Sequence, residues 1–287
     1  MSPWERHRPL ILTAVLLAIL GASVLAAWSL VWQRHIPADR GEDILRRIRA
    51  KTLPSYWGSK ESIRWYLIQD ASNRPVGYMV IVRKPIGQGY SGATLRRLGG
   101  EQQGESWALN AAATKGSYAA TLGGRGLPDT QIVLSNGLVT VTRQRAGSQA
   151  QATTAAPANY IPEGLRDLVA AEVAKSGTTA RFCFTLNPES LLENRVHFTS
   201  ITMTPHGPDQ VRLESHFIQG EIDETCYFDA KGEVYRIDDN ISHSSTRQTD
   251  LSSLAKWFPE VTEIQRDLEG GTPEPQDTTG TEKPAPA

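Results

Sequence analysis

The sequence predicts a mainly β protein of the α+β class: a curved antiparallel sheet with two or three covering helices, preceded by one N-terminal transmembrane helix. Three observations predict it. Paired β-rich runs flank short turn signals, helical patterns are few, and a long uncharged run stands near the N-terminus. The chain has 287 residues and a formal net charge of −1, so it carries no basic surplus that would attract nucleic acid.

The uncharged run, Leu10 to Trp32, is 23 residues long, enough to cross a hydrocarbon core of about 30 Å as a helix. We expect it to contact the lipid bilayer as a single-pass anchor. Residues 1–9 are then a cytoplasmic stub, and the body lies in the periplasm. A cleaved signal peptide is the alternative, because Val24-Leu25-Ala26 has the small-residue spacing of a cleavage site. Both interpretations place the body outside the cytoplasm.

Residues 33–59 are expected to form a juxtamembrane helix and linker, because Ile44, Leu45 and Ile48 make a short apolar stripe among basic residues. Such a helix either positions the domain or contacts anionic lipid head groups. Residues 60–268 are expected to form the extracytoplasmic β-rich domain. The tail, residues 269–287, has too few apolar residues to pack a core and is expected to be disordered.

The first β-rich pair is "IRWYLIQDASNRPVGYMVIVRK", Ile63 to Lys84, in which apolar residues alternate on both faces. This pattern indicates strands covered on both sides and joined at Asn73-Arg74-Pro75. Asn136-Gly137 joins a second pair and Asp229 to Gly232 joins a third. Three hairpins of one kind predict a meander of antiparallel strands. We therefore interpret the first hairpin as scaffold and not as a site.

The segments between the hairpins have weaker patterns. The glycine-rich residues 87–122 are expected to hold short strands, and residues 145–159 a low-complexity connection. A helix is expected from Pro162 to Gly177, followed by a second β-rich block and two short helices after residue 250. The two β-rich blocks, each preceded by a helix, indicate a loose internal repeat.

Motifs that would carry chemistry are weak. Gly87 to Gly92, "GQGYSG", fits a dinucleotide-binding pattern, but no helix follows it, so we interpret it as a loop between strands. Cys183 lies between two phenylalanines, a setting that disfavours a nucleophilic thiolate. The histidines lack metal-ligand spacing, and Glu221 and Asp223 fit a solvated sheet face. We expect no enzyme and no catalytic residue, cofactor or metal.

The two cysteines, Cys183 and Cys226, lie in predicted strands of an exported body and form a candidate disulfide. A bridge requires Cα atoms within about 7 Å of each other. The alternative is two small buried hydrophobic side chains.

The stretch "RWYLIQDASNRPVGYMVIV" resembles the hairpin of exported bacterial β-sheet modules, including those that precede transglutaminase-like domains. The resemblance covers about twenty residues, on the order of one hairpin, and implies a β-sheet fold. An anchor that carries a curved sheet with helices is also similar in architecture to lipoprotein-carrier and lipopolysaccharide-bridge proteins.

These observations favour a non-catalytic, membrane-anchored envelope protein that binds or scaffolds an unknown envelope protein. The alternative is a carrier or bridge for a lipid-like ligand, held in the concavity of a half-open sheet. A deep cavity lined by Trp65, Tyr78, Trp107 and Phe217 would favour the carrier. A filled core with a polar groove would favour the scaffold.

Overall fold

The computed structural model describes Ser23 and residues 38–122, 130–145, 148–185, 191–192, 195–215 and 222–269. The predicted anchor, Leu10 to Trp32, lies outside these residues apart from Ser23, and so do Phe217, Glu221 and the tail from residue 270. No helix in the described part of the chain is long and apolar enough to span a bilayer.

Sixteen strands are described. The first eight are β1 Ser62–Gln69, β2 Pro75–Ile86, β3 Gly89–Leu98, β4 Glu101–Asn110, β5 Gly116–Leu122, β6 Thr130–Ser135, β7 Leu138–Arg145 and β8 Ser148–Ala155. The others are β9 Ala180–Phe184, β10 Leu191–Leu192, β11 Arg195–Val196, β12 Thr199–Gly207, β13 Gln210–Ser215, β14 Ile222–Phe228, β15 Val234–Asp239 and β16 Ser244–Thr249. The mainly antiparallel β class predicted from the sequence is confirmed.

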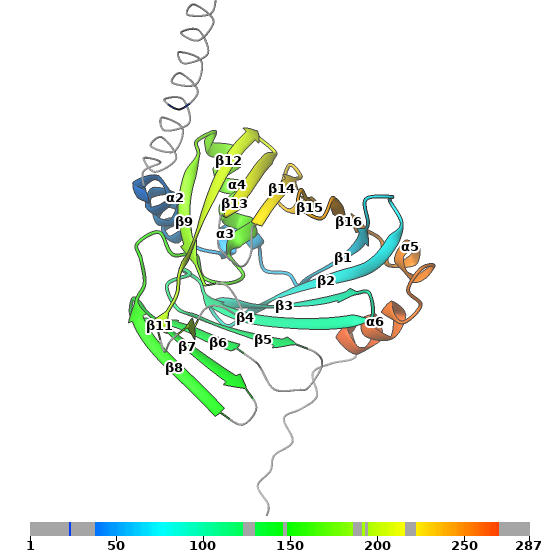
Figure 1. Ribbon diagram of the computed structural model, residues 1–287, viewed down its shortest axis with the longest axis horizontal. Helices are drawn as coiled ribbons and strands as arrows, with labels where there is room; N and C mark the ends of the chain where they lie inside the picture. The colour runs from blue at the N-terminus through cyan, green and yellow to red at the C-terminus, as the bar shows by residue number, and fades with distance from the viewer. Residues whose placement is uncertain are drawn as a thin grey trace, which may run out of the picture.

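Fourteen of these strands form one strongly curved sheet (Figure 1), in the order β8-β7-β6-β5-β4-β3-β2-β1-β16-β15-β14-β13-β12-β9. The order describes two meanders, β1–β8 and β9 with β12–β16, that join where β16 pairs with β1, and β10 and β11 form a separate two-stranded sheet. At this junction Trp65 pairs with Thr249 and Leu67 with Arg247. Antiparallel neighbours need only short turns, which explains why the turn signals located the hairpins well. Asn136 and Gly137, both at positive φ, join β6 to β7.

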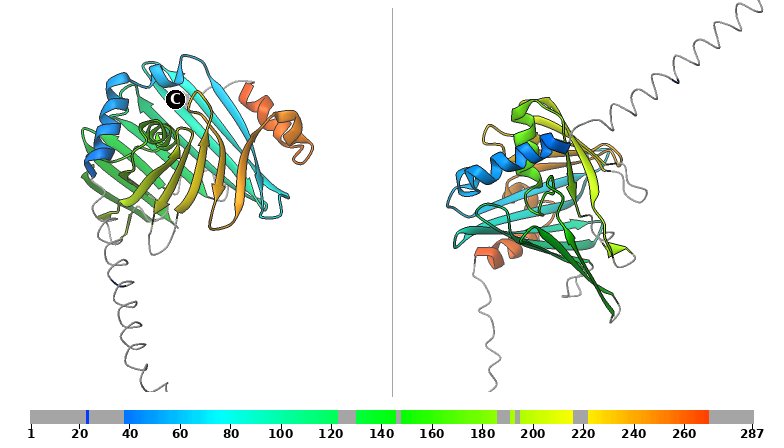
Figure 2. Two further views of the ribbon diagram at one scale, coloured as in Figure 1. Left: turned by 90° about the horizontal axis from the view of Figure 1, so that it is seen from above. Right: turned by 90° about the vertical axis from the view of Figure 1, so that its left-hand side faces the viewer.

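The concave face of the sheet, here called the inner face, carries most of the core. Tyr66 and Ile68 of β1 point to it, and alternation sends Trp65 to the opposite, outer face. Helix α4, Arg166–Ser176, lies between the two halves of the curved sheet (Figure 2) and packs against β12 and β13. Buried side chains lie on nearly every side of this helix, as expected for a helix that fills the concavity of the sheet.

Helix α2, Ala38–Lys51, belongs to this core as well. Ile44, Leu45 and Ile48 are at most 2% exposed, and α2 packs against β9 and α4. A Cβ atom at Gly41 would lie 2.1 Å from the Arg181 carbonyl oxygen, so glycine permits the close approach of this helix to β9. The packing therefore continues across residue 60, where the sequence suggested a division between linker and domain. Helix α3, Pro54–Trp57, follows directly.

Two helices cover the outer face. α5, Leu251–Ala255, begins at Asp250, whose carboxylate accepts a hydrogen bond from the Ser253 amide (2.8 Å). α5 and α6, Val261–Glu269, cover Trp65, Tyr78 and Val80 of β1 and β2. Helices thus lie on both faces of the sheet, as the apolar residues on both faces of the first hairpin require.

Two segments differ from the sequence interpretation. Residues 148–155, expected as part of a low-complexity connection, form the regular strand β8, paired with β7 along its whole length. The glycine-rich segment holds β3, β4 and β5 with longer strands than expected. Gly87 and Gly89 lie at the β2–β3 turn of an antiparallel hairpin, as the loop interpretation of "GQGYSG" predicted.

Candidate functional site

A pocket of about 350 Å³ lies inside the curved sheet, between the two meanders and the first turn of α4. We call it the inner pocket. Its walls combine nine apolar or aromatic side chains with nine charged ones: Arg64, Arg83, Arg96, Glu105, Glu163, Arg166, Asp167, Glu224 and Glu233. Buried clefts that gather ionisable groups in this way are typical of functional sites.

Strand alternation aims these charges inward. Arg64 of β1, Ile81 of β2, Thr94 of β3 and Glu105 of β4 are successive partners in the ladder, so their side chains form one row on the inner face. Arg64 and Glu105 are therefore three strands apart, about 14 Å at the usual strand spacing. The uncharged side chains of β2 and β3 form the floor between them.

Glu233 closes one end of the inner pocket by joining the two meanders. Its two carboxylate oxygens each lie 2.7 Å from a guanidinium nitrogen, one of Arg64 and one of Arg83. The Arg83 guanidinium also lies 4.8 Å from the ring centre of Trp57. Two cations share one carboxylate here, so this end keeps a net positive charge.

The other end contains two carboxyl groups that repel each other. Withdrawal from water, and then the nearby Glu105 carboxylate, raise the pKa of Glu163 to about 8. The Thr185 hydroxyl donates a hydrogen bond to Glu163 (3.2 Å), which opposes the shift. Withdrawal from water also raises the pKa of Glu105, although Arg166 opposes it. At neutral pH Glu163 is therefore mostly protonated and can donate a hydrogen bond.

Arg166, the first residue of α4, adds a further cation to the inner pocket. Its guanidinium lies 3.5 Å from Glu224 and 3.9 Å from Asp167. Four arginines thus face five carboxyl groups, one of them protonated, and the inner pocket is nearly neutral overall. A site of this kind can receive a small polar group that offers both donors and acceptors. Hydrocarbon is a poor ligand for it, because it would desolvate charged groups and leave them without partners.

Trp107 separates the inner pocket from the strands beneath it. Its ring lies flat on Gly92 of the neighbouring strand, and a Cβ there would fall 2.2 Å from the indole. Gly164, just before α4, covers the ring from the other side. The glycines that make β3 look weak in sequence thus create the space for a large aromatic side chain.

The four side chains expected to line a ligand cavity do not come together. Trp65 and Tyr78 point to the outer face and pack under α5 and α6, where Phe258 lies 5.3 Å from Tyr78. Trp107 alone reaches the inner pocket, and Phe217 lies outside the described residues. The expectation was wrong for Trp65 and Tyr78, because apolar alternation on both faces did not indicate which face is concave.

The candidate disulfide is not formed, and both cysteines are free. Cys183 lies on β9 and Cys226 on β14, with β12 and β13 between them. Three strand spacings, about 14 Å, exceed the reach of a disulfide. Burial raises the pKa of both thiols.

Asp223, which the sequence placed on a solvated sheet face, forms an ion pair within the sheet. Asp223 accepts two hydrogen bonds from the Arg212 guanidinium, at 2.9 and 2.8 Å. The described residues contain no cluster of three or more His, Cys, Asp or Glu side chains that could hold a metal ion.

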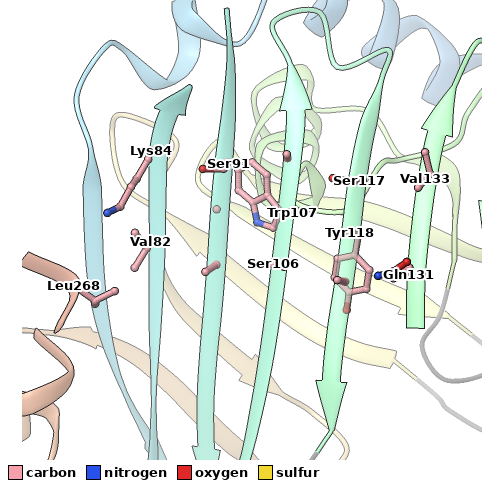
Figure 3. Close-up of a pocket in the computed structure, with 14 residues that line it drawn as sticks. Val82, Lys84, Ser91, Ser106, Trp107, Ser117, Tyr118, Gln131, Val133 and Leu268 are labelled. Atoms are coloured by element: carbon pink, nitrogen blue, oxygen red, sulfur yellow. The ribbon is translucent and has the colours of Figure 1, made fainter. Parts of the chain in front are cut away.

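A second hollow, of about 550 Å³, lies on the outer face of β2 to β6 beside Leu268 of α6 (Figure 3). Half of its lining residues are small, and Ser91, Ser106 and Ser117 contribute hydroxyl groups. Its one charged side chain, Lys84, forms an ion pair with Glu61 (3.0 Å). This outer hollow therefore offers a ligand hydroxyl groups but no cluster of charged side chains.

Comparisons with known proteins give little more. No protein-family model matches the chain, and no curated protein matches it. A solved structure, a β-barrel-like protein of the domain of unknown function DUF1849 from Brucella abortus, aligns with a TM-score of 0.40 and 10% sequence identity. The alignment covers 66% of this chain and 94% of that one. The hairpin's resemblance to modules that precede transglutaminase-like domains, and the likeness to lipid carriers, remain predictions.

Sequence reasoning missed most of the inner pocket. Its charges are scattered from residue 64 to residue 233, and only the fold brings them together. One local signal existed: Arg64 lies between Ile63 and Trp65, and Arg83 directly follows the apolar run that ends at Val82, although arginine is seldom buried in a scaffold strand.

Proposed function

We propose that the protein is a non-catalytic, membrane-anchored envelope protein that binds a partner by accepting one of its polar groups in the inner pocket. The proposal joins two predictions, the anchor at Leu10 to Trp32 and the absence of catalysis, to the chemistry of the pocket. The partner's group would combine hydrogen-bond donors and acceptors, because the pocket offers both arginines and carboxyl groups.

One observation carries the proposal: the part of the concavity that core side chains leave open, the inner pocket, is lined by nine charged side chains. α4 and the core side chains of both meanders occupy the rest. A carrier of acyl chains needs a large apolar cavity, whereas this space has a volume of about 350 Å³, and nine charged side chains, including the ion-paired Glu233, line it. This geometry favours a polar partner over the lipid-like ligand.

A pair of variants on one strand tests the proposal. Glu105 points into the inner pocket, and the next residue, Ser106, points to the outer face. Glu105→Lys reverses a charge at the site, and Ser106→Lys adds the same side chain outside it. Both positions are exposed, so both variants should fold.

Each variant is purified in detergent from its native envelope, and co-purifying molecules are quantified by mass spectrometry. We expect a partner that accompanies the wild type and Ser106→Lys, and whose recovery falls at least about tenfold with Glu105→Lys, because the variant puts a charge of the opposite sign at the contact. Equal recovery with both variants would contradict the proposal.

A further inference from the structure

The two edge strands of the sheet, β9 and β8, differ in whether other backbone covers them. Beside β9, the backbone of residues 159–161 runs along the strand. The Cys183 amide donates to the Asn159 carbonyl (3.0 Å), and the Ile161 amide donates to the Cys183 carbonyl (2.7 Å). The chain thus covers this edge with its own backbone. At the other end, β8 pairs with β7 and with no other strand of the described chain.

The hydrogen-bond pattern identifies which groups of β8 point away from β7. The Ala156 amide bonds to the Gly137 carbonyl (2.8 Å), and the register with β7 continues from there without a shift. Antiparallel ladders alternate between bonded and non-bonded pairs. The even-numbered residues of β8 therefore bond to β7, and the backbone N–H and C=O groups of Gln149, Gln151, Thr153 and Ala155 point to the open edge.

This edge lacks the features that usually prevent pairing. Edge strands are normally protected by charged side chains, proline, a bulge or short length. β8 has eight residues, "SQAQATTA", with no charge, no proline and no register shift. Strand β11 lies near β7 and β8, but among the described strands it pairs with β10 and not with β8, and its Val196 packs on the core.

We propose that the β8 edge docks a second copy of this chain, with the two β8 strands antiparallel about a two-fold axis at Ala152. Gln149 then pairs with Ala155 of the other copy, and Gln151 with Thr153. About eight backbone hydrogen bonds form, since each of the four bonded pairs exchanges two.

A second copy fits better than an unrelated strand because the edge is complementary to itself. Its exposed side chains are small or polar and uncharged, so no like charges meet when it pairs with its own copy. The interface is isologous and closes after two subunits, leaving no open β8 edge. A shared membrane anchor would raise the local concentration of the two copies.

Cross-linking tests the geometry directly. At the axis Ala152 faces its own copy in a non-bonded pair, with Cα atoms about 4.5 Å apart, within disulfide range. The full chain carrying Ala152→Cys, oxidised in its native membrane, should yield a disulfide-linked dimer joined at residue 152. Gln131→Cys, exposed on the outer face of β6, is the matched control and should remain monomeric.

The second measurement is the dimer dissociation constant of the detergent-solubilised full chain, by light scattering or analytical ultracentrifugation. Gln151→Pro removes an edge-facing N–H and should raise this constant at least tenfold, whereas Gln151→Ala keeps the N–H and should not. Three results would overturn the proposal: a monomer with no Ala152→Cys cross-link, equal cross-linking through Gln131→Cys, or an Ala152→Cys adduct with a different protein.

Discussion

Replacing one glycine should test how Trp107 is held at the inner pocket. A Cβ atom at Gly92 would lie 2.2 Å from Trp107 Cζ2 and 2.3 Å from Cε2, whereas carbon atoms normally approach to about 3.5–4.0 Å. The Trp107 ring has little room to move, because a Cβ atom at Gly164 would lie 2.4 Å from its Cδ2 atom. The centre of the Trp57 ring also lies 5.7 Å from the centre of the Trp107 ring. Gly92→Ala therefore overpacks the core and should cost about 1–3 kcal/mol of unfolding free energy.

Gly104 provides the matched control on the adjacent strand. A Cβ there meets nothing within 4 Å, and its φ is not positive. Gly104→Ala should be neutral or stabilising by up to about 1 kcal/mol, because alanine restricts the unfolded chain. Urea unfolding of the detergent-solubilised chain, followed by tryptophan fluorescence and circular dichroism, compares the two. If Gly92→Ala unfolds at the same urea concentration as Gly104→Ala, the packing argument for Trp107 is wrong.

Three further predictions follow from the outer face, the cysteines and the pocket carboxyl groups. Trp65→Ala should remove about 3–5 kcal/mol of unfolding free energy, because this ring is buried beneath α5 and α6. Thiol titration under denaturing, non-reducing conditions should find two free thiols, from Cys183 and Cys226. The stability that Glu163 contributes should be lost as pH rises from about 4.5 to about 8, because over this range the folded state holds a proton that the unfolded state releases.

Each of these has a result that would contradict it. A Trp65→Ala variant that melts like the parent while a co-purifying molecule disappears would make the hairpin a binding site. A thiol count of zero would restore the disulfide. For Glu163, wild type and Glu163→Gln are unfolded in urea at several pH values. The variant's stability relative to wild type should increase with pH, and a constant difference would refute the raised pKa.

The sequence predicted the hairpins because turn chemistry is local. Asn136-Gly137 adopts the positive φ angles that such a turn needs, and Asp250, a residue type that favours helix N-termini, caps the first of the two short helices expected after residue 250. β8 was missed for the opposite reason. Its alanines and glutamines have little intrinsic preference for strands, and pairing with β7 decides its conformation.

The inner pocket could not be predicted because it depends on curvature and on distant pairings. The pairing of β16 with β1 folds the second meander over the first, and this brings Glu233 onto Arg64 and Arg83. Alternation correctly placed Trp65 and Tyr66 on opposite faces of β1. Alternation did not indicate which face would be concave. Trp65 was therefore expected to line a ligand cavity, whereas it packs under α5 and α6 on the outer face.

Native mass spectrometry of the wild-type chain, released from detergent micelles, tests most directly whether the inner pocket receives a polar group. If the inner pocket binds a polar group, the spectrum should show a partner protein or a small polar molecule bound to the wild-type chain in a fixed ratio. This bound species should be absent from Glu105→Lys. A phospholipid bound one per chain, retained through delipidation and unaffected by Glu105→Lys, would contradict it and favour the lipid carrier.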